Sequence, residues 1–213
     1  MSEKCFTNGE IYEVLKKRIV ELEYAPGQIL NENEIAAEFN LSRTPVRKIF
    51  EQLKNNRLLI IIPRYGAQVA PLDFKYIKSV FEVIREMEAH ATRLAAERIS
   101  DEHIRDLEAI IERLKGYNID RDYKKIILDD GMFHKIIFDN CNNPCLSEIL
   151  HNLHMHTERL WFYVQKNITE IDMFIDTLTN IACAIKNRDA ALADRYAKEH
   201  TDLFVEKIKE KLL

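Results

Sequence analysis

Two arginines lie four residues apart in the segment Ser42-Arg43-Thr44-Pro45-Val46-Arg47, so they share one face if that segment is helical. A guanidinium is a forked donor that matches O6 and N7 of guanine, and a threonine can contact a phosphate or a thymine methyl. Ser42 suits the N-cap and would present the helix N-terminus to a phosphate. Pro45 falls in the first turn, where its missing N–H costs little. The segment is typical of a helix whose first turn reads DNA.

The net charge of the whole chain, −4 at pH 7 over 213 residues, points away from a nucleic-acid partner. The distribution along the chain reverses that indication. Residues 42–66 carry six basic side chains against Glu51 alone, a local charge of +5. The basic residues are Arg43, Arg47, Lys48, Lys54, Arg57 and Arg64. Positive charge is therefore concentrated on one short stretch of an otherwise acidic protein.

The elements around this stretch can be predicted from caps and hydrophobic periods. A capping box at residues 7–10 starts one helix, which ends before Pro26-Gly27, and residues 31–40 form a second, short helix. Ser42 starts the third, and residues 58–62 and 67–70 read as two strands around a turn at Arg64-Tyr65-Gly66. Three helices and a hairpin predict a winged helix-turn-helix in residues 1–72, with Gly66 allowing the wing tip to approach DNA and Arg64 beside it.

Residues 73–213 are expected to be entirely helical. Amphipathic patterns cover residues 73–99, 100–116, 120–139, 144–165, 169–186 and 189–212, joined by short connections. Short connections favour antiparallel neighbours, so the segment predicts an antiparallel helical bundle. The fold class is mainly α, with 5 glycines and 5 prolines leaving little room for an all-β alternative. A solvated basic face on a plain three-helix domain would explain the charge, but not its coincidence with a capped helix and a basic wing.

Residues 11–72 resemble the N-terminal domain of GntR-family bacterial transcription regulators. The resemblance is carried by residues 25–30 (APGQIL), 34–36 (EIA), 41–47 (LSRTPVR) and 65–69 (YGAQV), in that order. It implies that Arg43, Thr44, Arg47 and Gly66 lie at DNA-contacting positions. The chain departs from the family at Asn33, where an arginine often contacts DNA.

Residues 73–213 resemble the all-helical, FCD-like effector domain of the FadR-type branch of that family. The matching stretches are residues 85–88, 95–96, 133–134, 143–146 and 184–185, with Asp189, Ala193 and His200. The resemblance implies an effector-binding and dimerisation domain, a small carboxylate effector, and a divalent metal held by an Asp-x3-His pair and two later histidines. Asp130, His134 and His200 match this ligand set, whereas Leu178 stands at the place of the middle histidine.

The chemistry of this ligand set can be checked in part. Asp130 and His134 are four residues apart, so one helix face presents an oxygen and an imidazole to the same point. Three protein ligands can still hold a divalent ion such as Zn²⁺, Ni²⁺ or Mn²⁺ and leave positions for water or effector. Alternatively, Asp130 caps a helix and the two histidines are hydrogen-bonded walls of a pocket.

Two further features, a histidine-bearing helix face and Arg85, have two interpretations each. His151 and His154 share a helix face from which His156 points away, and this face is either solvated and pocket-lining or supplies His154 as a substitute ligand. Arg85 either clamps an effector carboxylate through a bidentate pair or forms a salt bridge with Glu88 or another helix.

The sequence thus predicts a ligand-responsive, cytoplasmic transcription regulator, most commonly a repressor, that binds an operator as a homodimer. Cytoplasmic placement follows from acidic residues among the first apolar positions, four cysteines without a CxxC pair, and no apolar run of membrane length. The alternative is a metal-dependent hydrolase using Asp130, His134 and His200, but the sequence contains no HExxH motif.

Overall fold

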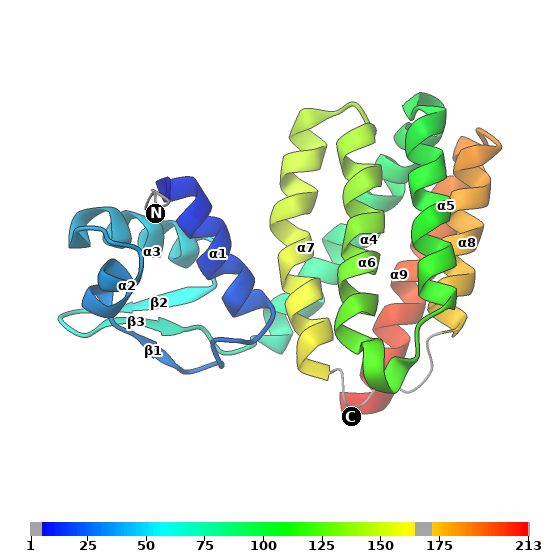
Figure 1. Ribbon diagram of the computed structural model, residues 1–213. Helices are drawn as coiled ribbons and strands as arrows, with labels where there is room; N and C mark the ends of the chain where they lie inside the picture. The colour runs from blue at the N-terminus through cyan, green and yellow to red at the C-terminus, as the bar shows by residue number, and fades with distance from the viewer. Residues whose placement is uncertain (1–5, 165–171, 213) are drawn as a thin grey trace. The chain divides into compact units, whose positions relative to one another are not determined.

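The computed structural model describes residues 6–164 and 172–212, and the chain divides into two compact units, Met1–Asp73 and Phe74–Leu213 (Figure 1). The first unit contains three helices and three short strands, and the second is helical. The fold is therefore mainly helical with an N-terminal winged helix-turn-helix, as the sequence predicts. No helix in the described part of the chain is long and apolar enough to cross a membrane.

The helices of the first unit are α1 (Asn8–Val20), α2 (Glu32–Glu38) and α3 (Arg43–Asn55). The predicted capping box of α1 is present: the Glu10 backbone N–H donates to the Thr7 hydroxyl, and the Thr7 N–H donates to the Glu10 carboxylate. Asn40 has a φ of 53°, the left-handed conformation that ends a helix and turns the chain. The three helices bury one apolar face each, including Ile11, Leu15, Ile19, Ile35, Val46, Ile49, Phe50 and Leu53.

The wing is a three-stranded antiparallel sheet rather than the predicted hairpin. Strand β2 (Leu59–Ile62) pairs with β3 (Gly66–Val69), and β3 also pairs with β1 (Ile29–Leu30), which gives the order β1-β3-β2. The sequence analysis missed β1 because two residues are too few to show an alternating pattern. Because β1 lies between α1 and α2 in the chain, its pairing with β3 attaches the segment that connects these helices to the wing.

Gly66 meets two requirements at the start of β3. Its φ of 120° lies in a region that L-residues with a side chain rarely adopt, and a Cβ atom there would lie 2.3 Å from the Leu30 carbonyl oxygen. The close approach of β1 therefore demands glycine at this position for reasons internal to the fold, whatever its role at DNA.

The second unit consists of α4 (Phe74–Arg98), α5 (Asp101–Lys115), α6 (Ile119–Asn140), α7 (Pro144–Val164), α8 (Asp172–Lys186) and α9 (Ala190–Leu212). These bounds follow the predicted helices closely, while the expected end at Gln165 and the expected start at Thr169 lie outside the described residues. Helix α4 packs against α6, α7, α8 and α9, so it runs through the interior of the unit (Figure 1).

Candidate functional site

Helix α3 separates its apolar and basic residues onto opposite faces. Val46, Ile49 and Leu53 are fully buried in the first unit, whereas Ser42, Arg43, Thr44 and Arg47 are exposed. Ser42 occupies the N-cap, as expected, but its hydroxyl makes no hydrogen bond to the helix. The first turn of α3 therefore presents two arginines, a threonine and a serine hydroxyl to solvent.

Both arginines of this turn are bound to one carboxylate. Arg47 Nε donates to Glu32 Oε2 at 2.9 Å, and Arg43 Nη2 donates to the same oxygen at 3.1 Å. Burial raises the pKa of Glu32, but hydrogen bonds from Arg47 and Arg43 outweigh that effect and lower it. The sequence analysis missed Glu32, since the contact spans 11 and 15 residues.

The wing contributes further groups on the same unit. Arg64 has a φ of 72° and is exposed, and the neighbouring residue Tyr65 is 73% exposed. Arg47, Arg64 and Gly66 line a common groove between α3 and the wing. Lys54, by contrast, pairs with Glu51 at 2.9 Å on α3 itself. The groove thus brings Arg47 of the turn beside Arg64 and Gly66 of the wing, while Ser42, Arg43 and Thr44 do not line it.

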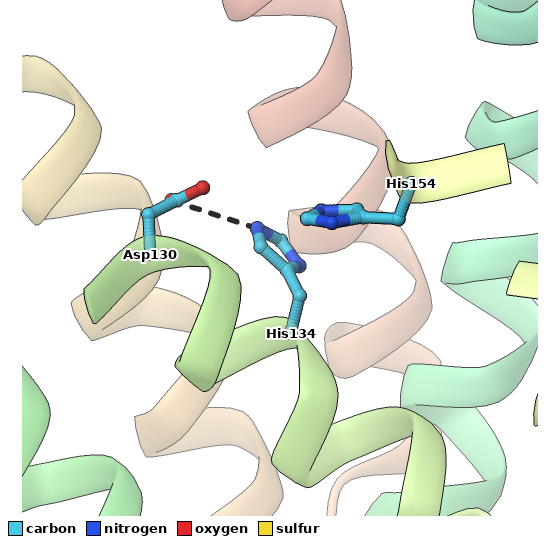
Figure 2. A group of neighbouring side chains, drawn as sticks. All are labelled: Asp130, His134 and His154. Carbon is cyan, nitrogen blue, oxygen red and sulfur yellow. Dashed lines mark ion pairs between the residues drawn. The ribbon is translucent and has the colours of Figure 1, made fainter. Parts of the chain in front are cut away.

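A second cluster lies inside the helical unit. Asp130 and His134 project from α6 toward His154 of α7, and Figure 2 shows the His134 ring between the other two side chains. One potential ligand atom from each of these residues lies within 4.8 Å of the others. His200 of α9 and Glu88 of α4 line the same small cavity of about 40 Å³. The structure therefore brings together all three residues of the predicted ligand set and adds His154 and Glu88.

His134 is held between two carboxylates. Its Nδ1 forms an ion pair with Glu88 Oε1, and its Nε2 lies 3.6 Å from Asp130 Oδ1. Asp130 Oδ1 is buried and has no hydrogen-bond partner among the described residues. Asp130 lies in the middle of α6, so it does not cap a helix, contrary to the alternative considered above. A buried carboxylate oxygen without a hydrogen-bond partner, beside imidazoles, is the environment that a cation would complete.

Charge coupling dominates the protonation of this cluster. Burial alone would lower the pKa of His134, but the carboxylates of Glu88 and Asp130 raise it to about 10. Burial likewise opposes ionisation of Glu88, and the charge of His134 lowers its pKa to about 2. Burial and the positive charge of His134 lower the pKa of His154 and of His200 to about 4, so both are neutral at pH 7.

The remaining histidines of α7 have structural partners. His151 Nε2 lies 2.7 Å from Asp139 Oδ1 at the surface, and the buried His156 ring makes an edge contact with Tyr76. Leu178, at the position of the family's middle histidine, is buried and apolar. His154 is thus the residue of the 151–156 cluster that lines the cavity.

Arg85 lies at a different place from His154. Its guanidinium donates two hydrogen bonds to the Asp202 carboxylate on α9, at 2.7 and 2.8 Å, and it also pairs with Glu86. It lines an open apolar groove of about 730 Å³ between α4, α7 and α9 rather than the histidine cavity. Of the two interpretations of Arg85, the salt bridge is present, with Asp202 and Glu86 rather than Glu88 as its partners.

Glu88 is the functional candidate that sequence reasoning did not single out. It follows Ile84 and precedes Ala91 and Ala95 on the buried face of α4, so a carboxylate stands in an apolar stripe. A buried acidic residue at such a position requires a partner, and this was the available signal. The identity of the partner, His134, follows only from the packing of α4 on α6.

The exposed basic turn and wing of a winged helix-turn-helix, joined to a helical unit with a buried polar cavity, define a DNA-binding transcription regulator. Residues 7–69 match the family model of bacterial regulatory proteins, gntR family, and residues 79–203 match the FCD domain. The chain belongs to the GntR family of bacterial regulators, in the FadR-type branch with an FCD C-terminal domain. Members of this family are regulators and not enzymes, which removes the hydrolase alternative.

Individual relatives agree with this assignment. The chain is 26% identical over 207 residues to the HTH-type transcriptional repressor RspR of Escherichia coli K12, covering 95% of this chain and 89% of that protein. It is 26% identical over 212 residues to the gluconate operon transcriptional repressor of Bacillus subtilis 168, covering 97% and 87%. The solved structure of E. coli McbR/YncC shares the fold with a TM-score of 0.85 at 20% identity, covering 97% and 98% of the two chains.

Proposed function

We propose that this regulator is a repressor that reads its operator through the first turn of α3. The observation that carries the proposal is the parallel presentation of Arg43 and Arg47, four residues apart on the exposed face of α3 and held by Glu32. Each guanidinium can fork onto a guanine in the major groove, and Thr44 can contact a phosphate or a thymine methyl. The free hydroxyl of Ser42 is suited to a phosphate oxygen.

The wing groups are assigned to the DNA backbone. Arg64 carries the positive charge beside the wing tip, and Gly66 leaves room for a phosphate to approach. One winged helix supplies few contacts, so we propose that a homodimer, formed through the helical domain, binds a pseudo-palindromic operator. Domain 1–72 would then bind DNA, and domain 73–213 would bind effector and partner, in the cytoplasm.

Selection of bound duplexes from a random-sequence library tests this proposal. We expect the wild-type protein to enrich a two-fold symmetric site with half-sites about one helical turn apart. The double variant Arg43→Ala with Arg47→Ala should enrich no sequence, while Lys75→Ala in α4 controls for the loss of a positive charge outside the proposed interface. Enrichment of an unchanged site by the double variant would exclude reading through α3.

A divalent cation is proposed for the cavity of the helical domain. Asp130 Oδ1, which is buried and has no hydrogen-bond partner among the described residues, and the neutral imidazoles of His154 and His200 fit a cation. His134, whose pKa is raised, adds a third nitrogen when the cation displaces its proton. One oxygen with imidazole nitrogens suits Zn²⁺, Ni²⁺ or Mn²⁺. When bound, the cation would supply positive charge for the oxygen of an effector. Elemental analysis of protein purified without added metal or a nickel column tests this, and metal-free protein that binds none of these ions would exclude it.

The effector is proposed to be a small carboxylic acid that requires this cation. None of the described side chains lining the cavity is a lysine or arginine, whereas Glu88, Asp130 and Glu158 are acidic. An organic anion would be repelled from such walls unless a cation stood between them. Binding would release the operator only if the effector favours one arrangement of the DNA-binding domains over another.

A thermal-shift screen of small carboxylic acids, with and without added Zn²⁺, tests this dependence. We expect stabilisation by an acid only in the presence of the cation. A hit that binds equally well to the chelated protein would instead point to the outer groove that Arg85 lines.

A further inference from the structure

Two histidines of the cavity, His134 and His200, are each held through the ring nitrogen Nδ1. His134 Nδ1 forms its ion pair with Glu88, which is 5% exposed, and this leaves His134 Nε2 on the side of Asp130. His200 Nδ1 lies 2.7 Å from the hydroxyl of Thr177 on α8. Glu88 and Thr177 thus each contact the Nδ1 atom of one imidazole, and the two imidazoles come from different helices.

The hydrogen bonds of Thr177 fix the tautomer of His200. A threonine hydroxyl has one hydrogen, and Thr177 Oγ1 donates it to the Phe174 carbonyl oxygen at 2.8 Å. Toward His200 the hydroxyl can therefore only accept, so His200 Nδ1 carries the hydrogen. The other ring nitrogen, Nε2, then keeps its lone pair, which is the form of imidazole that binds a metal.

Glu88 has the corresponding effect on His134. The Glu88 carboxylate forms its ion pair at Nδ1, so a cation would bind the opposite nitrogen, Nε2, in place of the proton there. In metal centres such outer carboxylate and hydroxyl partners orient the ring and increase its basicity, and their loss typically weakens metal binding 10- to 100-fold. Neither Glu88 nor Thr177 belongs to the ligand set that the family resemblance implies.

We propose that Glu88 and Thr177 are positioning residues of the cation site, which hold His134 and His200 so that both Nε2 atoms can reach one divalent cation. The inference rests on the cation site proposed above. It also gives α8 a role in this chain. Leu178 of α8 supplies no ligand, but the preceding residue, Thr177, orients the proposed ligand His200.

The test measures Co²⁺ binding by its visible absorption, and Zn²⁺ affinity by competition with a chromophoric chelator. Thr177→Val keeps the shape of the side chain and removes the acceptor, while Thr177→Ser restores it. Glu88→Leu removes the carboxylate, and Glu88→Gln keeps an acceptor without the charge. Thr179→Val on α8 and Glu97→Gln on α4 are matched controls, because Thr179 bonds only within its own helix in the described structure and Glu97 is exposed.

We expect about 10- to 100-fold weaker binding for Thr177→Val and Glu88→Leu, recovery in Thr177→Ser, a smaller loss in Glu88→Gln, and no change in the controls. In the metal-free protein, ¹⁵N spectra of the imidazoles should show His200 as the Nδ1–H tautomer, and Thr177→Val should remove that preference. Circular dichroism of Thr177→Val checks that the variant is folded. A change of tautomer in a folded variant cannot be explained by unfolding.

Two failures are distinguishable. If the wild type binds Co²⁺ and the four variants bind it equally well, or if Thr179→Val weakens it as much as Thr177→Val, the positioning inference is wrong and the cation site stands. If the wild type binds neither Co²⁺ nor Zn²⁺, the cation site itself is wrong, and the inference falls with it.

Discussion

Glu32, the first residue of α2, accepts a hydrogen bond at 2.9 Å from Nε of Arg47 on α3, the helix that we propose enters the major groove. The same carboxylate also binds Arg43, so both guanidinium groups are held before DNA arrives. A carboxylate in this position restricts the arginines and repels the phosphates of any DNA that approaches. Both effects should increase the ratio of the affinity for the operator to the affinity for random DNA.

Glu32→Gln should therefore lower specificity rather than abolish binding. With the carboxylate gone, affinity for random duplex is expected to rise and discrimination in favour of the operator to fall, each by a few-fold, since exposed ion pairs are worth about 0.2–1 kcal/mol. Fluorescence anisotropy with operator and scrambled duplexes at one salt concentration measures this ratio. Glu34→Gln, two residues along and exposed, controls for the lost charge. An equal effect of both variants would mean that Glu32 acts only by repelling the DNA phosphates and not by holding the arginines.

Arg43→Ala should weaken operator binding by about 1–3 kcal/mol and relax the base preference at one position of each half-site. The loss should be much smaller on random DNA, because the contact is to a base. Lys48→Ala provides the contrast: a phosphate contact would weaken binding to every sequence alike and reduce the slope of log affinity against log salt by about one. An equal loss of affinity for operator and random DNA in Arg43→Ala would mean that Arg43 contacts the DNA backbone and not a base.

Gly66→Ala should destabilise the winged-helix unit by more than about 2 kcal/mol. A Cβ atom at this position meets the Leu30 carbonyl oxygen at 2.3 Å, and the φ of 120° adds strain. Gly27→Ala is the matched control, because its φ is also positive, at 86°, but no atom lies within 4 Å of the added Cβ. Urea unfolding of the two variants separates the backbone clash from conformational strain alone, and equal losses would contradict the clash.

His154→Gln should weaken cation binding at least as much as His200→Gln. The close group of ligand atoms consists of Asp130, His134 and His154, whereas the family's ligand set contains His200 and not His154. Isothermal titration of chelator-stripped protein with Zn²⁺ compares the two variants, with the exposed His90→Gln as control. Unchanged Zn²⁺ affinity in His154→Gln would mean that His154 lines the cavity without binding the cation.

The cation-free protein should lose stability as the pH rises from 6.5 to 10. The pKa of His134 is raised from 6.5 to about 10 in the folded state, so its contribution is fully present below pH 6.5 and is lost as the pH approaches 10. The contribution of Glu88, whose pKa falls from 4.5 to about 2, is present above pH 4.5 and is lost in acid. The free energy of unfolding should thus fall by up to about 1.4 kcal/mol per pH unit on the alkaline side.

Urea unfolding across this pH range, in the presence of a chelator, measures the slope. Glu88→Gln removes the anion that holds the proton on His134, so its alkaline slope should be shallower than that of the wild type. Glu97→Gln should retain the wild-type slope. Parallel curves for wild type and Glu88→Gln would mean that the pair does not control the pH dependence.

The sequence alone determined the elements that depend on neighbours along the chain. The capping box at Thr7, the left-handed Asn40 and the helical faces follow from local hydrogen bonds and a 3.6-residue period, and so does the joint presentation of Arg43 and Arg47. The GntR and FCD motifs, read in order, indicated the class of protein for the same reason: they are short and local.

Only the tertiary structure decided which side chains meet across elements. Glu32 with Arg47, Glu88 with His134, and Thr177 with His200 are joined by the packing of different helices, and β1 exists only because β3 lies beside it. No local period encodes these distances, since they depend on how the apolar faces fit together. The cavity, its buried Asp130 oxygen and the separation of Arg85 from His154 arise from that fit.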